Sequence, residues 1–260
     1  MKRILLKYVF LIILVVVLGA CMENDGAINT SIKLPDSSIY QGDLDRNGLF
    51  SGIGILKWST GSTYKGEFKE GLMHGKGTLI DISGATLDGI FEKGLISEGV
   101  IITNDGTQYI GNFVNELLTG KGEIKFSNGG TYAGEVQEGL ENGFGTYLSP
   151  NGDTYKGYFK DGKLEGKAHI KFSKGGDTEG VFVKGLKQGK GSFTYKNGDR
   201  YIGNFIDDIP SGQGIFERHN GDEYVGDFLH GEYHGLGKYT RADGSFIEGK
   251  FKYGEYIGEE

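Results

Sequence analysis

The chain has 260 residues, including 48 Gly, 3 Pro, 15 Tyr and 16 Phe, and its formal net charge is -7 at pH 7. Residues 1–20 carry three basic and no acidic side chains, so the chain without them has a net charge of -10. This acidic average argues against nucleic acid as a ligand and against electrostatic docking on anionic lipid. Regularly spaced aromatic residues argue against low-complexity disorder, because they supply the apolar area that disordered segments lack.

The first 20 residues have the pattern of an export signal. Three basic residues precede an uncharged apolar stretch over residues 8–17, which is short for a membrane-spanning helix of about 20 residues. The residues Leu18-Gly19-Ala20-Cys21 then resemble a bacterial lipobox, in which the cysteine becomes diacylated and begins the mature protein. The resemblance implies cleavage between Ala20 and Cys21 and lipidation, for example with palmitate, at Cys21.

Cys21 is the one cysteine of the chain, so it cannot form an intrachain disulfide. Two acyl chains would anchor the protein stably, whereas one gives marginal binding. We therefore expect a protein of the bacterial cell envelope, lipid-anchored to a membrane on its periplasmic or cell-surface side. A plain cleaved signal with a free thiol and an uncleaved anchor stay open as alternatives.

The sequence divides into three parts. Residues 1–20 are the expected lipoprotein signal peptide, and residues 21–38 hold the lipidated cysteine and a polar segment interpreted as a flexible tether. Residues 39–260 form a repeat array. Its copies are marked by glycines at a period of 22 or 23 residues, which is typical of stacked repeat proteins: Gly66, Gly89, Gly111, Gly134, Gly157, Gly180, Gly203, Gly226 and Gly249.

Each copy predicts a β-hairpin. In Thr63–Lys69, Tyr64, Gly66 and Phe68 alternate with charged residues, as in a half-buried strand. A second strand follows each GxG pair. Asn-Gly or Asp-Gly pairs between copies, such as Asn197-Gly198, predict type I′ turns, and the link around Gly71 is expected to be a longer loop.

The strand glycines predict how the copies pack. A residue without a Cβ leaves a slot in which an aromatic ring can lie flat over the backbone. One hairpin buries too little to offset its ordering entropy, so the copies must support one another. The expected shared core is the column Phe68, Phe91, Phe113, Val136, Phe159, Phe182, Phe205, Phe228 and Phe251.

The recurring frame YxGxFxxGxxxGxG resembles the MORN repeat, named for membrane occupation and recognition nexus. It is clearest from Tyr64 to Gly77 and from Tyr224 to Gly237, and it covers about residues 39–258. The resemblance implies an all-β fold, an elongated, twisted single-layer antiparallel sheet of about ten stacked 23-residue hairpins. It also implies an interaction scaffold that often self-associates. Some copies depart from the frame, as where Glu116 and Asp208 replace the loop glycine.

The residue patterns of the chain predict no catalytic or metal site. The cluster His230, Glu232 and His234 does not converge three ligands by alternation alone, and the GxG pairs lack a P-loop lysine and a strand-to-helix context. The Asn-Gly turns lack the ligand spacing of a calcium loop. No nucleophile, base and orienting group can be assembled, so we expect neither an enzyme nor a cofactor.

The leading hypothesis is a membrane-anchored, exported scaffold that binds a protein partner through its repeat surface. The alternative is an envelope carbohydrate-binding module that uses a column of tyrosines as stacking platforms. For the scaffold, the expected binding surface is the aromatic groove or the charged outer face. The candidate binding residues are Tyr64, Tyr109, Tyr132, Tyr155, Tyr201 and Tyr224. The last copy is expected to lack its second strand, which predicts an unpaired strand edge and a homodimer formed through the C-terminal repeats.

Overall fold

The computed structural model describes residues 30–259, and Cys21 lies outside this range. The described residues contain 21 strands and no helix, and they divide into two compact units. The first unit comprises residues 30–104 and 113–116 of the described chain. Its strands are β1 (Thr30–Lys33), β2 (Ile39–Leu44), β3 (Phe50–Lys57), β4 (Thr63–Lys69), β5 (Leu72–Ile80), β6 (Thr86–Glu92) and β7 (Leu95–Ile102).

The second unit comprises residues 105–112 and 117–259 of the described chain, and β8 (Gln108–Val114) contributes residues to both units. Its other strands are β9 (Leu117–Lys125), β10 (Thr131–Gln137), β11 (Leu140–Leu148), β12 (Thr154–Lys160), β13 (Lys163–Lys171), β14 (Asp177–Val183), β15 (Leu186–Thr194), β16 (Arg200–Ile206), β17 (Ile209–Glu217), β18 (Glu223–Leu229), β19 (Glu232–Thr240), β20 (Phe246–Lys252) and β21 (Glu255–Gly258).

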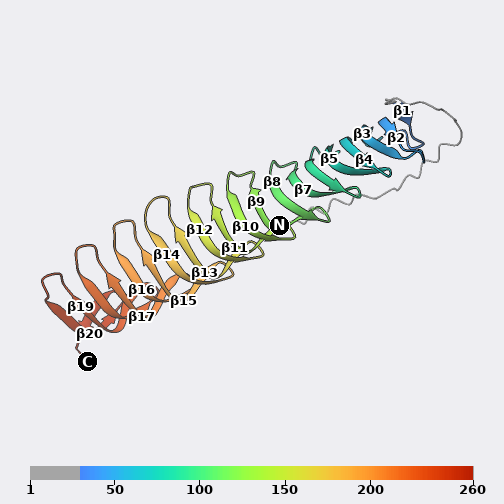
Figure 1. Cartoon of the computed structure of the whole chain (residues 1–260). Coiled ribbons are helices and arrows are strands. Elements are labelled where there is room, and N and C mark those ends of the chain that lie inside the picture. The colour runs from blue at the N-terminus through green and yellow to red at the C-terminus, as the bar shows by residue number, and fades with distance from the viewer. Residues whose placement is uncertain (1–29, 260) are drawn as a thin grey trace. The chain divides into compact units, whose positions relative to one another are not determined.

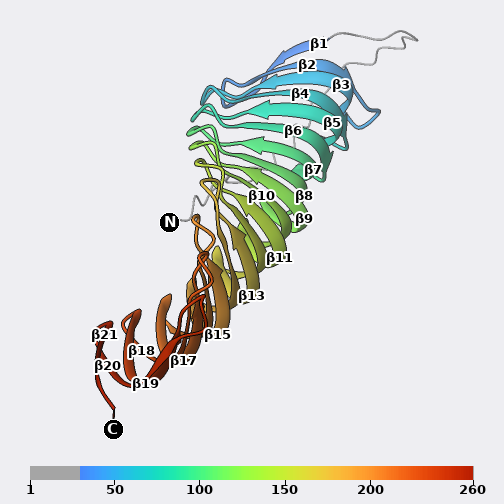
Figure 2. The same ribbon diagram turned by 90° about the vertical axis from the view of Figure 1, so that its left-hand side faces the viewer.

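Both units are antiparallel meanders. From β1 to β7, and again from β9 to β21, each strand pairs with the strand before it and the strand after it in the sequence. Within the second unit, successive bent hairpins lie side by side (Figure 1). The strands of the first unit follow one another in the same way (Figure 2). The predicted all-β class and its hairpin repeat are therefore confirmed.

The sheet of the first unit starts before the repeats do. Strand β1 pairs with β2 through Ile32 opposite Tyr40, and Leu34 and Ser38 are buried. These residues belong to the segment 21–38 that was interpreted as a flexible tether, so that interpretation is corrected from Thr30 onward. The physical reason is that β1 supplies backbone partners to the edge of β2, which would otherwise be unpaired.

The two kinds of turn are the reverse of those expected. At the Asn-Gly links, only the glycine has positive φ. Phe126 N–H bonds to Gly130 O at 2.9 Å and Gly129 N–H to Phe126 O at 2.9 Å, which defines a three-residue loop. The two-residue turns lie at the opposite hairpin ends, where Glu70 and Gly71 both have positive φ. Positive φ at both central residues is the requirement of a type I′ turn.

Neighbouring type I′ turns are joined by backbone hydrogen bonds. Gly231 N–H, for example, donates to Pro210 O at 2.9 Å. Asp208, which replaces the loop glycine, keeps a φ of 69° and donates its N–H to Lys187 O at 3.0 Å. The sequence departure at this copy therefore leaves the loop geometry unchanged, because aspartate tolerates the left-handed region.

A bulge bends the second strand of the hairpins. In β4 and β5, Gly66 lies opposite Gly77 but Glu67 lies opposite His74, so no residue of β4 lies opposite Gly75 or Lys76 in the register. Gly75 has a φ of 55°, a conformation that glycine adopts at little cost. The first glycine of each GxG frame thus serves the bulge and not the packing slot predicted for the strand glycines.

The second glycine belongs to a row of glycines that crosses the strands, here called the glycine row. In the second unit it runs through Gly191, Gly203, Gly214, Gly226 and Gly237, each opposite the next. A Cβ added at Gly77 in the first unit would lie 2.2 Å from Tyr64 Oη. The tyrosine ring therefore lies directly over bare backbone, as the sequence predicted.

The aromatic core joins one repeat to the next. The ring of Tyr201 meets Phe205 of its own repeat at 5.0 Å and Phe228 of the next repeat at 4.8 Å, both edge-to-face. Such pairs contribute about 0.5 to 1.5 kcal/mol each beyond the area they bury. The predicted column is confirmed, since all nine of its members are buried: Phe68, Phe91, Phe113, Val136, Phe159, Phe182, Phe205, Phe228 and Phe251.

The last repeat is more complete than expected. Strand β21 pairs with β20 through Phe251 opposite Tyr256, so this repeat has a short second strand. The prediction that it lacks one is corrected. Strand β21 has no further partner in the described chain, and homodimer formation through this end stays a prediction.

The slot predicts that Gly77→Ala destabilises the first unit by about 1 to 3 kcal/mol, the usual cost of overpacking a core. The added methyl group would overlap the fully buried Tyr64 ring. Thermal unfolding followed by circular dichroism measures this effect. Lys76→Ala is the control, because Lys76 is the exposed neighbour on the same strand. Equal midpoints for Gly77→Ala and the unmodified chain would show that the slot is loose.

Candidate functional site: the faces of the repeat array

The predicted tyrosine column is mostly interior. Tyr64, Tyr132, Tyr201 and Tyr224 have no exposed area, so a ligand at the surface cannot stack on their rings. Tyr109 and Tyr155 are half-buried, and for these two residues a binding role stays a prediction.

The tyrosine hydroxyls form hydrogen bonds with backbone carbonyl groups at the bulges. Tyr64 Oη lies 3.0 Å from Glu67 O and 3.3 Å from His74 O, and Tyr224 Oη lies 3.0 Å from Asp227 O. The hydroxyl donates its proton where the bulge removes carbonyl groups from the ladder. Burial raises the pKa of both hydroxyls to about 12, so the donating form persists at neutral pH.

A second set of aromatic rings in the second unit is half-exposed. Phe172, Phe193, Tyr195 and Phe216 form a chain of ring contacts, with Phe193 and Tyr195 at 4.6 Å and Tyr195 and Phe216 at 5.9 Å. Tyr195 exposes 39% of its surface. Phe193 and Phe216 lie on the second strands of their repeats and were not among the candidate binding residues predicted from the sequence.

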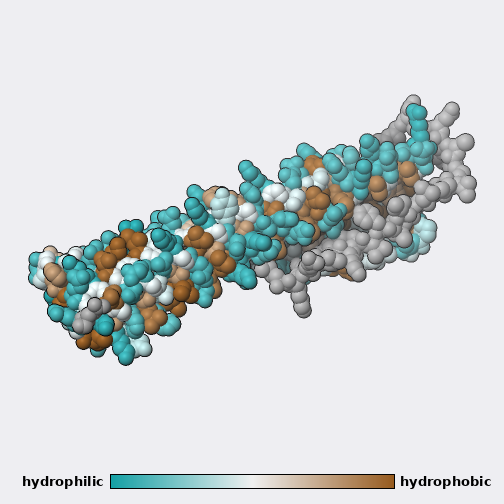
Figure 3. Space-filling model, turned by 90° about the horizontal axis from the view of Figure 1, so that it is seen from below, coloured by the Kyte–Doolittle hydropathy of each residue, from teal (hydrophilic) through white to brown (hydrophobic). Residues whose placement is uncertain are grey.

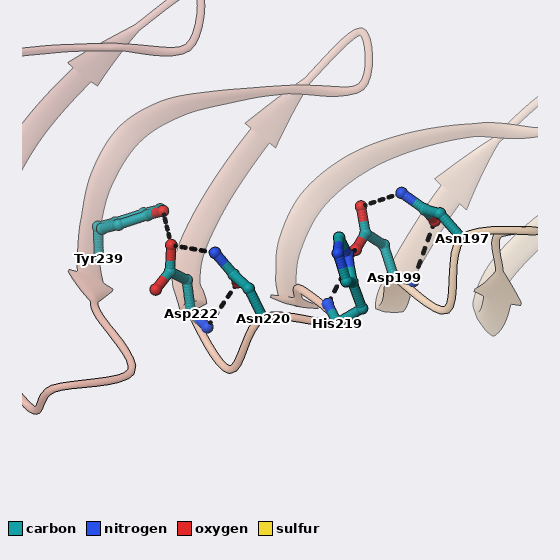
Figure 4. A network of polar contacts seen from close by, with 6 residues as sticks. All are labelled: Asn197, Asp199, His219, Asn220, Asp222 and Tyr239. Atoms are coloured by element: carbon teal, nitrogen blue, oxygen red, sulfur yellow. Dashed lines mark hydrogen bonds and ion pairs between the residues drawn. The ribbon is translucent and has the colours of Figure 1, made fainter.

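The three-residue turns of the second unit are linked by side chains (Figure 4). Asp199 accepts hydrogen bonds from His219 N–H at 2.9 Å and Asn197 Nδ2 at 2.8 Å, and its carboxylate lies 2.8 Å from His219 Nδ1. The bond from the His219 backbone is the main cause that lowers the pKa of Asp199 to about 2. Asp222 repeats the arrangement one copy later, accepting from Tyr239 Oη at 2.7 Å.

Each such aspartate lies about one repeat before the backbone group that it accepts from. Asp153 accepts from Ser173 N–H at 2.8 Å, and Asp222 accepts from Ala242 N–H at 3.0 Å. The acidic residues after the Asn-Gly pairs therefore connect neighbouring turns by hydrogen bonds. The described residues contain no group of three or more His, Cys, Asp or Glu placed to hold a metal ion.

One repeat fills its slot with a lysine. Thr178 replaces the tyrosine, and the aliphatic part of Lys187, which is 2% exposed, lies against Gly180. Its Nζ donates to Ser192 O at 3.1 Å and to Thr178 Oγ1, and lies 3.4 Å from the centre of the Phe205 ring. Burial lowers the pKa of Lys187 to about 8 against the opposing effect of Asp208.

The face opposite the aromatic core, here called the outer face, is mixed in character. In the second unit, Phe144 and Tyr158 make an edge-to-face contact at 5.4 Å and are 44% and 52% exposed. A shallow hollow on this face is lined by residues that include Val181 and Ile202 beside Gly191 and Gly203 of the glycine row. Seen from below, the second unit shows apolar groups among hydrophilic ones (Figure 3).

These features define an open antiparallel array of β-hairpin repeats with an aromatic core and two accessible faces. The MORN repeat profile matches eight segments, which together cover well over half of the chain: residues 40–63, 64–86, 109–131, 132–154, 155–177, 179–200, 201–223 and 224–246. The chain therefore belongs to the MORN repeat family. This class of protein is a repeat scaffold for protein or membrane interaction.

Solved structures show weaker similarity. The TCP domain of SAS-4 from Drosophila melanogaster, in complex with a proline-rich motif of Ana2, is 11% identical. The match covers 68% of this chain and 90% of that chain, with a TM-score of 0.38. The TCP10 domain of Danio rerio CPAP, in complex with a STIL peptide, is 11% identical, with coverages of 85% and 99% and a TM-score of 0.39.

These low scores add nothing to the family assignment. A search of curated proteins gave no match. Residues 30–259 include no helix of a length and apolarity suited to crossing a membrane.

Lys187 predicts a pH effect on stability. Between pH 8 and 10.5, the amine of the folded chain is largely neutral while the unfolded chain keeps its proton, so the free energy of unfolding rises with pH. The full rise from this group is about 3 kcal/mol. Lys187→Met is expected to remove the rise and to be at least as stable at pH 7, because no charge remains buried.

The measurement is denaturant unfolding of both proteins across this pH range. The difference between their free energies of unfolding cancels the contribution of tyrosines and other titratable groups that both proteins share. A parallel pH dependence in the two proteins would contradict the assignment.

Proposed function

We propose that this protein is an exported, lipid-anchored scaffold of the bacterial cell envelope that binds a protein partner through its repeat array. The observation that carries the scaffold role is the apolar area left on the second unit although its aromatic core is closed. Tyr158, Val225 and Leu236 on the outer face are 52%, 42% and 48% exposed. Apolar groups gathered at a surface are typical of protein interaction sites.

The anchor is supported by the sequence of residues 1–21. The basic start, the apolar stretch and the four residues ending in Cys21 together match a lipoprotein signal. A diacylated Cys21 would hold the array at a membrane through a segment that ends where β1 begins.

The burial of the tyrosine column argues against the carbohydrate-binding alternative. Four of its six proposed stacking platforms are fully buried, and their hydroxyls are directed to bulge carbonyls. The half-exposed rings around Tyr195 are equally suited to apolar protein side chains, so no specific observation favours a glycan.

The anchor is tested by Cys21→Ala in cells fed a radiolabelled fatty acid. We expect label in the unmodified protein and none in the variant, together with loss of the protein from the detergent phase. Retained label in Cys21→Ala would contradict lipidation at this residue. The result does not depend on how the array binds its partner.

The scaffold role is tested by a photo-reactive phenylalanine at position 158 or 225 in living cells. We expect a discrete adduct of defined mass at these positions. Position 65 is the control, because Lys65 lies on the outer face of the first unit in the column of Val225. An array that gives no adduct at any exposed position would argue against the scaffold role.

A further inference from the structure

The acidic average of the chain hides a basic block. Residues 155–200, two consecutive repeats, contain eleven basic and five acidic side chains. The preceding repeat, residues 132–154, has four acidic and no basic side chains, and the following repeat, residues 201–223, has five acidic and one basic. The charge therefore changes sign twice along the second unit.

The cations of this block face solvent. Lys187 is buried in the slot, and the other ten basic side chains are exposed. Within the described chain, the ion pairs in this block are those of His169 with Asp177 and of Asp199 with His219. None of the ten exposed lysine and arginine side chains has a carboxylate of residues 30–259 within 4.0 Å.

Three of these lysines flank apolar groups on the outer face. Lys156 and Tyr158 lie two residues apart on β12, and the register places Lys167 opposite Val181 and Lys190 opposite Asn204. Lys167, Lys190, Val181 and Ile202 line the same shallow hollow over the glycine row, together with the single carboxylate Glu179, so two cations face one anion there. This combination supplies both positive charge and apolar contact area.

We propose that the outer face of β12–β16 binds an acidic segment of a partner protein in which carboxylates recur about every third residue, with apolar side chains between them. The carboxylates pair with Lys156, Lys167 and Lys190, and the apolar side chains contact Tyr158, Val181 and Ile202. This inference rests on the proposed scaffold function and names the chemistry of its partner. Lys167 and Lys190, equivalent residues of successive repeats, lie two strands or roughly 10 Å apart, which an extended peptide spans in about three residues.

An anionic membrane fits this surface less well. A flat bilayer would meet several repeats at once, including the acidic repeats on both sides of the basic block. On the same outer face, Glu135 lies in the repeat before the block and Asp227 lies in the second repeat after it. Their repulsion from anionic lipid offsets the attraction of the lysines, whereas a peptide can contact the basic block alone.

The test uses the full chain and a synthetic peptide with Glu at every third position and Leu between. We expect binding that weakens as salt rises, because exposed charges are screened. The triple variant Lys156→Glu, Lys167→Glu and Lys190→Glu is expected to bind roughly tenfold or more weakly. The same peptide with Gln in place of Glu is expected to bind weakly to both.

The matched control is the triple variant Lys57→Glu, Lys65→Glu and Lys76→Glu on the outer face of the first unit. It has the same total charge, and its changes are at exposed positions in strands β3, β4 and β5. We expect its peptide affinity to stay close to that of the unmodified chain. Circular dichroism shows whether both variants keep the β-structure.

Three outcomes would overturn the proposal: equal losses in the two triple variants, no binding of the Glu peptide, or equal binding of the Gln peptide. A second arm uses phosphatidylcholine vesicles with and without phosphatidylglycerol, so that their difference removes any contribution of the anchor. Lysine-dependent binding to phosphatidylglycerol without peptide binding would assign the block to lipid. Failure of either arm leaves the Cys21 labelling result unaffected.

Discussion

The structure depends on aromatic rings that lie flat over a row of glycines. At Gly77 and Gly237, a Cβ would lie 2.2 and 2.3 Å from a tyrosine hydroxyl oxygen, so no side chain fits beneath the ring. The ring also meets a phenylalanine of the next repeat, as Tyr224 meets Phe251 at 5.1 Å. Because each such ring packs against a neighbouring repeat as well as its own, the stability of one hairpin depends on the next.

The space over the glycine row limits the size of the side chain that fills it more strongly than the polarity of that side chain. Leu118 lies over Gly111 and Gly122 in one repeat, and Lys187 lies against Gly180 in another. The lysine keeps its amine hydrogen-bonded and close to an aromatic ring, which reduces the cost of burying it. A repeat that lacks the tyrosine can therefore remain in register with its neighbours.

Because the core residues recur from repeat to repeat, the repeats differ mainly in their surface side chains. The tyrosine and phenylalanine columns recur in most copies, whereas the outer-face column reads Lys156, Glu179, Ile202 and Val225 in four successive repeats. The average charge led to the expectation that the chain docks electrostatically on neither nucleic acid nor anionic lipid. The repeat-by-repeat distribution shows instead that one surface can be basic in an acidic chain, because each repeat presents its own few side chains.

The periodic glycines and aromatic residues were sufficient to predict hairpin repeats, their buried phenylalanine column and the ring-over-glycine packing. These features depend on local alternation and on the absence of a Cβ, which sequence reports directly. The tertiary structure decided which turns are type I′, because Glu70 takes positive φ whereas Asn128 does not, and that choice follows from the strand register and the bulge at Gly75. It also decided that Tyr64 and Tyr224 are core residues, since burial depends on contacts with neighbouring repeats that no single copy of the sequence contains.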